Sequence, residues 1–93
     1  MIRGFKDQRT EALFRRRSGR GFPPEVRLRA LRKLTMLHAA ATLTDLRSPP
    51  GNRLERLAGD RAGQWSIRVN DQYRICFVWD DRHAYDVELT DYH

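Results

Sequence analysis

Apolar residues follow two different spacings along the chain. In the first half they recur at helical spacing, at Val26, Ala30, Leu34, Leu37 and Ala41, with Leu31 beside them. This stripe predicts a helix over residues 24–43 that buries one side. In "GQWSIRVNDQYRICFVW", residues 63–79, apolar and polar residues instead alternate, which is typical of half-buried strands. The pattern therefore predicts a helical first half and a β second half.

Capping and turn residues set the boundaries of the remaining elements. Asp7 can N-cap a first helix that carries Ala12, Leu13 and Phe14, and glycines and prolines in residues 15–24 end it. We predict a short strand at 1–5, strands near 53–58, 64–69 and 73–79, and a last strand from Ala84 to the end. This order predicts one α+β domain over residues 1–93, with two N-terminal helices packed on one face of a mainly antiparallel sheet of four to five strands.

The alternation also fixes the register of the two central strands. A loop of three or five residues pairs Val69 with Tyr73 and Ile67 with Ile75, so that the apolar side chains meet. The same register sets Arg68 directly opposite Arg74, although facing like charges are destabilising. In the last strand the same phase predicts a core of Tyr85, Val87 and Leu89, and puts four residues on the arginine side: Asp86, Glu88, Thr90 and Tyr92.

Two arginines on one sheet face suit a phosphodiester ligand. Guanidinium forks bind phosphate oxygens and stabilise the added charge of a five-coordinate transition state. RNA cleavage by its own 2′-OH further needs a base and an acid, and Asp91, Tyr92 and His93 are titratable candidates. The alternative interpretation is a surface network in which Asp86 and Glu88 neutralise the arginines.

Charge supports a polyanionic partner. Of the 18 Lys and Arg residues only Lys6 and Lys33 are lysine; residues 1–79 hold 17 basic and 7 acidic residues, whereas residues 80–93 hold 1 and 5. A basic body attracts nucleic acid or acidic lipid, although a solvated arginine-rich surface explains the composition equally well. We assign Arg53, Arg56 and Arg61 to RNA binding. The basic loop with Arg15, Arg16, Arg17 and Arg20 could bind RNA or an acidic protein segment, or be simply solvated.

Other chemistries find no support in the residues. The single Cys76 lies in an apolar run and fits a small buried residue in a reducing compartment. We interpret His38, between Leu37 and Ala39, as structural. No metal-site spacing, glycine-rich phosphate loop or Ser-His-Asp motif occurs, and we expect no metal and no cofactor. Without an apolar leader or spanning segment, we expect a cytoplasmic protein that does not bind membranes.

Three segments carry a family resemblance. "IRGFKD…TEALF", "PPGNRLERLAGDRAGQWSIRVNDQYRICFVW" and the terminal "DYH" resemble the HigB-type toxins of type II toxin–antitoxin modules, within the RelE superfamily. The resemblance implies a RelE-like fold and a ribosome-dependent mRNA endonuclease that blocks translation. It implies as partners mRNA on the ribosome, ribosomal RNA and a helix-turn-helix antitoxin of the HigA type, with DNA reached only through the antitoxin.

The resemblance also assigns site residues. Arg74 falls where the superfamily has its phosphate-binding arginine, Arg68 lies on the neighbouring strand, and Asp91, Tyr92 and His93 match the terminal active-site motif. Some relatives carry a histidine in the segment that reads "LERL" here. If that histidine is their base, Glu55 or His93 must replace it. A non-catalytic module that binds RNA or the ribosome stays the alternative, and no helix-turn-helix spacing supports a DNA-binding repressor half.

Overall fold

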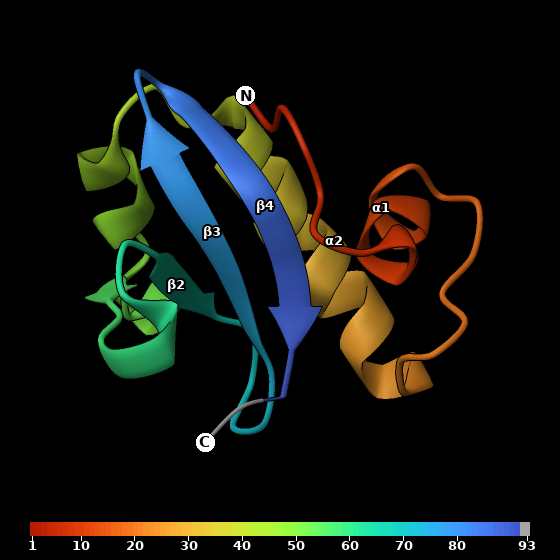
Figure 1. The fold of residues 1–93 in the computed structure, drawn as a ribbon. Coiled ribbons are helices and arrows are strands. Elements are labelled where there is room, and N and C mark those ends of the chain that lie inside the picture. The colour runs from red at the N-terminus through yellow and green to blue at the C-terminus, as the bar shows by residue number, and fades with distance from the viewer. Residues whose placement is uncertain (92–93) are drawn as a thin grey trace.

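The computed structural model describes residues 1–91, in which two helices accompany a four-stranded antiparallel sheet (Figure 1). The helices are α1 (Gln8–Phe14) and α2 (Pro24–Ala39), and the strands, in the order β1-β2-β3-β4, are Glu55–Arg56, Trp65–Arg68, Arg74–Asp80 and His83–Thr90. Three short 3₁₀ helices lie between α2 and β2: η1 (Leu43–Arg47), η2 (Pro50–Asn52) and η3 (Gly59–Arg61). The predicted α+β class is confirmed.

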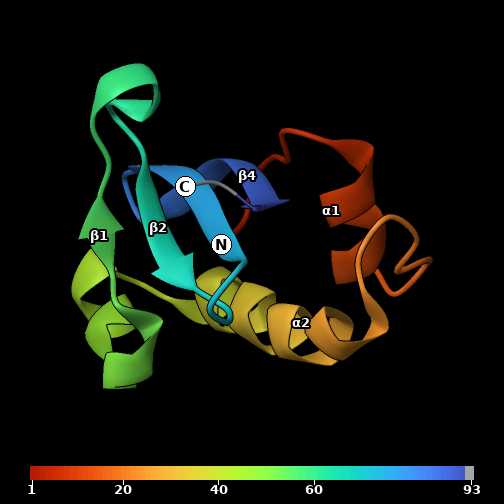
Figure 2. The same cartoon turned by 90° about the horizontal axis from the view of Figure 1, so that it is seen from below.

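The helices cover one side of the sheet. Figure 2 shows α2 running across the sheet, with α1 beside β4 and beside the N-terminal end of α2. As predicted, Asp7 caps α1 by accepting a hydrogen bond from the Thr10 N–H at 2.7 Å. The buried Thr10 Oγ1 accepts from the Leu89 N–H at 3.0 Å. One buried hydroxyl thus fixes α1 to the last strand.

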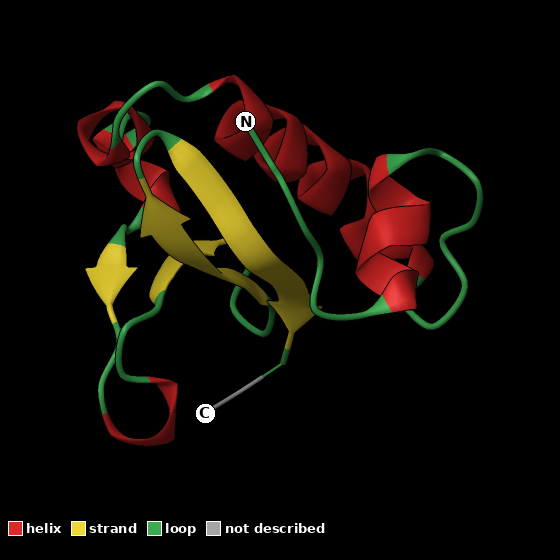
Figure 3. Ribbon diagram, turned by 45° about the horizontal axis from the view of Figure 1, so that its top comes forward, coloured by secondary structure: helices red, strands yellow, loops and turns green. Residues whose placement is uncertain are grey.

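The N-terminal segment lies beside β4 without forming a full strand (Figure 3). The strand predicted at residues 1–5 is reduced to two isolated parallel bridges, from Ile2 to Ala84 and from Phe5 to Val87. The Ile2 N–H donates to His38 Nδ1 at 3.1 Å. This bond from α2 holds the segment in place, and the structural interpretation of His38 is confirmed.

The core lies between α2 and the sheet, and its register is the predicted one. Trp65 pairs with Phe77 and Ile67 with Ile75, and the Val69 N–H donates to the Tyr73 carbonyl at 2.9 Å, which leaves a three-residue loop. The fully buried apolar residues of this layer come from both partners: Ala30, Leu34, Leu37, Ile67, Ile75, Phe77, Val87 and Leu89. The odd-numbered residues of β2 and the first half of β3 thus face the helices.

The predicted phase is wrong at the start of β4. Ala84 is fully buried, whereas Tyr85 is 37% exposed. A register shift opposite Cys76 and Val78 inserts one extra residue into β4, and Asp86 has a φ of 51° there. A β-bulge of this kind reverses the inward and outward alternation on one side of it. Val87 and Leu89, beyond the bulge, keep their predicted core positions.

The second helix ends earlier than predicted. It stops at Ala39, because Ala40 adopts an extended conformation. Thr42 then caps the 3₁₀ helix η1 through a capping box with Asp45, whose carboxylate accepts from the Ala41 and Thr42 N–H groups. These bonds to backbone and the Thr42 hydroxyl hold the pKa of Asp45 below its usual value. Within residues 1–91, no helix is long and apolar enough to cross a membrane.

Candidate active site

The sheet face turned away from α2 carries two rows of polar side chains, which we call the arginine face. One row crosses all four strands through Glu55, Ser66, Cys76 and Glu88, which are paired in register. The second row lies two residues further along, with Arg68, Arg74 and Thr90 in register. The predicted juxtaposition of Arg68 with Arg74 is confirmed, and Thr90, which was predicted on the same side of the sheet, is paired with Arg74.

Arg74 is held by hydrogen bonds from two directions. Its Nε donates to the hydroxyl of the buried Ser66 at 2.8 Å, and its Nη2 donates to the Arg53 carbonyl at 2.7 Å. Arg53 has a φ of 44°, in the left-handed region. Because the Arg74 side chain is only 15% exposed, the guanidinium is fixed in orientation while part of it stays accessible. A positioned fork of this kind suits an anionic ligand.

Glu55 lies next to this guanidinium. Strand β1 sets Glu55 opposite Ser66, and the Glu55 Oε2 lies 3.9 Å from Arg74 Nη2. The Glu55 side chain is 57% exposed, so its carboxylate is open to solvent beside a partly buried cation. Glu55 of the "LERL" segment therefore lies next to Arg74, the candidate phosphate-binding residue.

Arg68 has a different set of neighbours. Its Nη2 donates to Asp71 of the three-residue loop. Burial lowers the pKa of Lys33 on α2, and Arg29 and Arg68 lower it further by repulsion. Arg68 therefore contributes to a positive potential that reaches the flank of α2, in addition to its contact with the loop.

Glu88 neutralises a different arginine from the predicted pair. Its Oε1 accepts from Arg61 Nη1 at 3.1 Å and lies 3.9 Å from the Lys6 ammonium. Arg61, which comes from η3, also donates to Gln64 at 3.2 Å. The alternative of a neutralising surface network thus describes Glu88 and Arg61, but Glu88 forms no ion pair with Arg68 or Arg74 among the described residues.

The three arginines assigned to RNA binding do not share one surface. Arg53 and Arg61 border the arginine face through their contacts with Arg74 and Glu88. Arg56 follows Glu55 in β1 and pairs with Trp65, and its guanidinium lies 6.0 Å from the Trp65 ring centroid. Since neighbouring residues in a strand point to opposite faces, Arg56 lies on the other side of the sheet.

The last described residue, Asp91, lies against the loop between β2 and β3. Asp91 Oδ2 accepts from Gln72 Nε2 at 2.8 Å, which connects the end of β4 to the loop between β2 and β3. Thr90, one residue before it, is paired with Arg74. The predicted catalytic residues Tyr92 and His93 lie outside the described residues. Their assignment, like that of Arg68, Arg74 and Asp91, stays a prediction.

Cys76 is a buried, un-ionised thiol in the floor of the face. Burial raises its pKa to about 11, and the nearby Glu88 acts in the same direction while Arg61 and Arg74 oppose it. A thiol with this pKa is a poor nucleophile at neutral pH. The interpretation of Cys76 as a small buried residue is therefore confirmed. Within the described part of the chain, no three His, Cys, Asp or Glu side chains cluster in a way that could hold a metal ion.

Sequence reasoning missed the two groups that hold Arg74. The Ser66 hydroxyl could have been found, because Ser66 alternates with Arg68 in β2 and so shares its face. The contact with the Arg53 carbonyl could not have been predicted, because every residue has a main-chain carbonyl and the sequence does not show which one accepts this bond. The arrangement as a whole is a fixed guanidinium beside an exposed carboxylate, a combination that can bind a phosphate and accept a proton.

The fold has a counterpart among solved structures. The solved YoeB–YefM complex from Staphylococcus aureus contains a chain that superposes with a TM-score of 0.62, at 15% identity, covering 100% of this chain and 98% of that one. A family model described as "RelE-like toxin of type II toxin-antitoxin system HigB" matches residues 3–93. This chain therefore belongs to the HigB-like toxin family.

Two relatives agree with this assignment. Toxin HigB-1 of Vibrio cholerae serotype O1 is 43% identical over 86 residues, which are 91% of this chain and 90% of the relative. The protein named Endoribonuclease HigB of Proteus vulgaris is 32% identical over 93 residues, which span both chains completely. Membership of a toxin–antitoxin family gives this chain an antitoxin as its partner.

Proposed function

We propose that this toxin is an endoribonuclease that cleaves mRNA on the ribosome, with the arginine face as its active site. The observation that carries the proposal is the pairing of Arg74, fixed by Ser66 and the Arg53 carbonyl, with the exposed carboxylate of Glu55 at 3.9 Å. The name of the Proteus vulgaris relative, Endoribonuclease HigB, supports the same chemistry.

Arg74 is the group that binds the scissile phosphate. A guanidinium has five N–H donors, and the hydrogen bonds to Ser66 and Arg53 use one on Nε and one on Nη2. The donors on Nη1 have no partner among the described residues. They can bind a phosphate oxygen and stabilise the extra negative charge of the five-coordinate phosphorus. Because the guanidinium is already oriented, little reorganisation opposes this binding.

Glu55 is the general base of the proposed reaction. It takes the proton of the ribose 2′-OH as the 2′-oxygen bonds to phosphorus, and the bond from phosphorus to the 5′-oxygen breaks. The products are a 2′,3′-cyclic phosphate and a 5′-hydroxyl, whose proton comes from the general acid. Glu55 is favoured over His93 as the base because its carboxylate lies beside Arg74 and is open to solvent. The terminal group Asp91, Tyr92 and His93 supplies the acid.

The ribosome supplies the substrate in this proposal. The 17 basic and 7 acidic residues of positions 1–79 give a body that is attracted to ribosomal RNA. Arg53 and Arg61, at the border of the arginine face, contact the RNA backbone. A helix-turn-helix antitoxin neutralises the toxin and carries it to the operator DNA, which the toxin itself does not bind.

Mapping message ends tests this function. The purified chain is added to a translating ribosome complex and, in parallel, to the same mRNA without ribosomes, and new 5′ ends are located by primer extension. We expect new ends only in the translating sample. Salt-sensitive binding to the ribosome with no new ends would instead establish the non-catalytic alternative, since that module needs only the basic body.

A further inference from the structure

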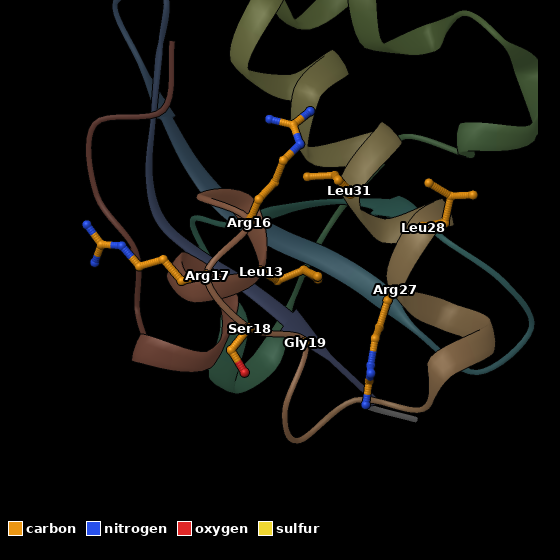
Figure 4. A pocket seen from close by; sticks show the side chains of 8 residues that line it. All are labelled: Leu13, Arg16, Arg17, Ser18, Gly19, Arg27, Leu28 and Leu31. Carbon is orange, nitrogen blue, oxygen red and sulfur yellow. The ribbon is translucent and has the colours of Figure 1, made fainter.

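A hollow of about 340 Å³ lies between α1 and α2, away from the arginine face (Figure 4). Its lining combines leucines and arginines from α1, from the loop that follows it and from the first half of α2: Leu13, Arg16, Arg17, Ser18, Gly19, Arg27, Leu28 and Leu31. The proposed nuclease reaction uses none of these residues. The hollow therefore needs an explanation of its own.

The lining of the hollow is apolar at its centre. Leu13 is buried and Leu31 is half-buried. Leu28 has 60% of its surface exposed, more than any other large hydrophobic residue within residues 1–91. An exposed leucine next to two others forms a small apolar patch in an otherwise charged surface. An apolar side chain of another molecule can pack against these three leucines and remove the exposed surface of Leu28 from water.

The rim of the hollow is cationic and contains no carboxylate. Arg16 and Arg17 have no ion-pair partner within residues 1–91, whereas the neighbouring Arg15 is paired with Glu11 at 2.9 Å. Arg27 lies directly against Gly19, where a Cβ would collide with it, and donates to the Phe22 carbonyl at 2.9 Å. The Arg27 side chain is thus fixed as one wall, and Arg16 and Leu31 also line the hollow (Figure 4).

We propose that this hollow is the docking site for an acidic, amphipathic segment of the antitoxin, which inserts one leucine-sized side chain between the two helices. The carboxylates of the segment pair with Arg16, Arg17 and Arg27. An apolar anchor in a pocket surrounded by charge pairs is the usual arrangement of a contact that dominates binding energy. The proposal rests on membership of the toxin–antitoxin family and is independent of the nuclease chemistry.

Two other occupants fit the lining less well. RNA would use the arginines, but its phosphates gain nothing from three leucines, which offer no flat ring for a base to stack on. A second copy of this chain could present its acidic residues 80–93, but two bodies with a formal net charge of +6 each repel one another. An acidic protein segment satisfies both the centre and the rim.

The hollow and the arginine face lie on different sides of the molecule. Leu28 is on the side of α2 opposite the buried stripe of Val26, Ala30 and Leu34, which packs toward the sheet. Figure 2 shows that the sheet lies on the other side of α2. Antitoxin binding and RNA cleavage can therefore be altered separately.

The test uses the full-length toxin and the antitoxin encoded beside its gene, with the dissociation constant measured by calorimetry. The variants are Leu28→Asp and Arg16→Glu, both at exposed positions, so that the fold is retained. Arg47→Glu, at an exposed position on η1, is the control for Arg16→Glu, because it changes the charge of the toxin by the same amount. Each variant is also assayed for inhibition of translation, and circular dichroism checks its fold.

We expect Leu28→Asp and Arg16→Glu each to weaken antitoxin binding on the order of tenfold or more. Inhibition of translation should be unchanged in Leu28→Asp, and in Arg16→Glu it should equal that of Arg47→Glu, which changes the charge of the basic body by the same amount. We expect Arg47→Glu and Arg74→Ala to bind the antitoxin normally. Unchanged affinity in both hollow variants would overturn the proposal. So would a loss of ribosome binding, or of a toxin dimer seen in ultracentrifugation, without a loss of antitoxin affinity. If Arg74→Ala alone lost its antitoxin affinity, the segment would belong on the arginine face instead.

Discussion

Arg68 and Arg74 lie directly opposite each other in β2 and β3, yet each guanidinium has its own partners. Arg74 is bound by Ser66 and the Arg53 carbonyl, whereas Arg68 contacts Asp71 in the loop. The repulsion expected for facing like charges is thereby reduced without a shared counter-ion. In the function that we propose, the two arginines have different roles: Arg74 binds the phosphate, and Arg68 adds positive potential beside it.

Replacing Glu55 by glutamine tests the proposed base. Glu55→Gln keeps the size of the side chain but cannot accept the 2′-OH proton, so we expect the cleavage rate to fall on the order of 10²–10⁴. The measurement is the rate of message cleavage in a translating ribosome complex, compared between Glu55→Gln and the unchanged protein.

Glu25→Gln is the matched control, because it makes the same substitution at an exposed glutamate in the first turn of α2, outside the arginine face. It should cleave at the rate of the unchanged protein. A Glu55→Gln protein with full activity would contradict the role of Glu55 as the base and transfer that role to the terminal residues.

The cap of α1 should contribute measurably to stability. Asp7 accepts the Thr10 N–H at 2.7 Å, and Asp7→Ala leaves that donor without its partner. We expect the free energy of unfolding to fall by about 1 kcal/mol. Urea denaturation followed by circular dichroism gives this value. Asp60→Ala, on the exposed helix η3, is the comparison and should change stability much less; equal losses would contradict the role of the cap.

Cys76 should make stability depend on pH in the alkaline range. Its pKa rises from an ordinary 9.0 to about 11 on folding, so the unfolded chain loses this proton first as the pH increases. The contribution is complete below about pH 9 and is lost as the pH passes through about 11. The difference in unfolding free energy between the unchanged protein and Cys76→Ala should therefore shrink between these values. A constant difference would place the thiol in a more polar environment.

The bulge in β4 reverses the expected sensitivity of two neighbouring residues. Ala84 has no exposed surface, so Ala84→Leu overfills the core and should cost about 1–3 kcal/mol of unfolding free energy. Tyr85 is 37% exposed, and Tyr85→Ser should cost less than this. Thermal unfolding of both variants decides the point. The opposite order would support the regular alternation that the sequence pattern predicts.

The register of β2 and β3 could be predicted because only one phase brings Ile67 against Ile75 and Trp65 against Phe77. That phase also determines the position of Arg68 and Arg74, so the centre of the candidate site follows from apolar residues alone. By contrast, the prediction that Tyr85 belongs to the core is wrong. Asp86, whose φ is 51°, did not reveal the bulge, because aspartate accepts a positive φ more readily than most residues but is found mostly at ordinary φ values.

The surroundings of Arg74 depend on residues that are distant in sequence. Glu55 and Arg56 are adjacent and both charged, yet one joins the arginine face and the other packs near Trp65. Only the pairing of a two-residue strand with β2 decides between them, and so short a strand carries no alternation to detect. The end of α2 at Ala39 was missed for a similar reason, since the Thr42 cap competes locally with an apolar pattern that continues to residue 43.

Replacement of Arg74 tests the central claim most directly. The rate of message cleavage in a translating ribosome complex is measured for Arg74→Ala and Arg74→Lys, with Arg32→Ala, exposed on α2, as the control. We predict that Arg74→Ala loses activity on the order of 10²–10³. We predict that Arg74→Lys restores little of it, because an ammonium cannot reproduce the fork that bridges Ser66, Arg53 and a phosphate. A folded Arg74→Ala protein that cuts the message at the rate of the control would contradict the account.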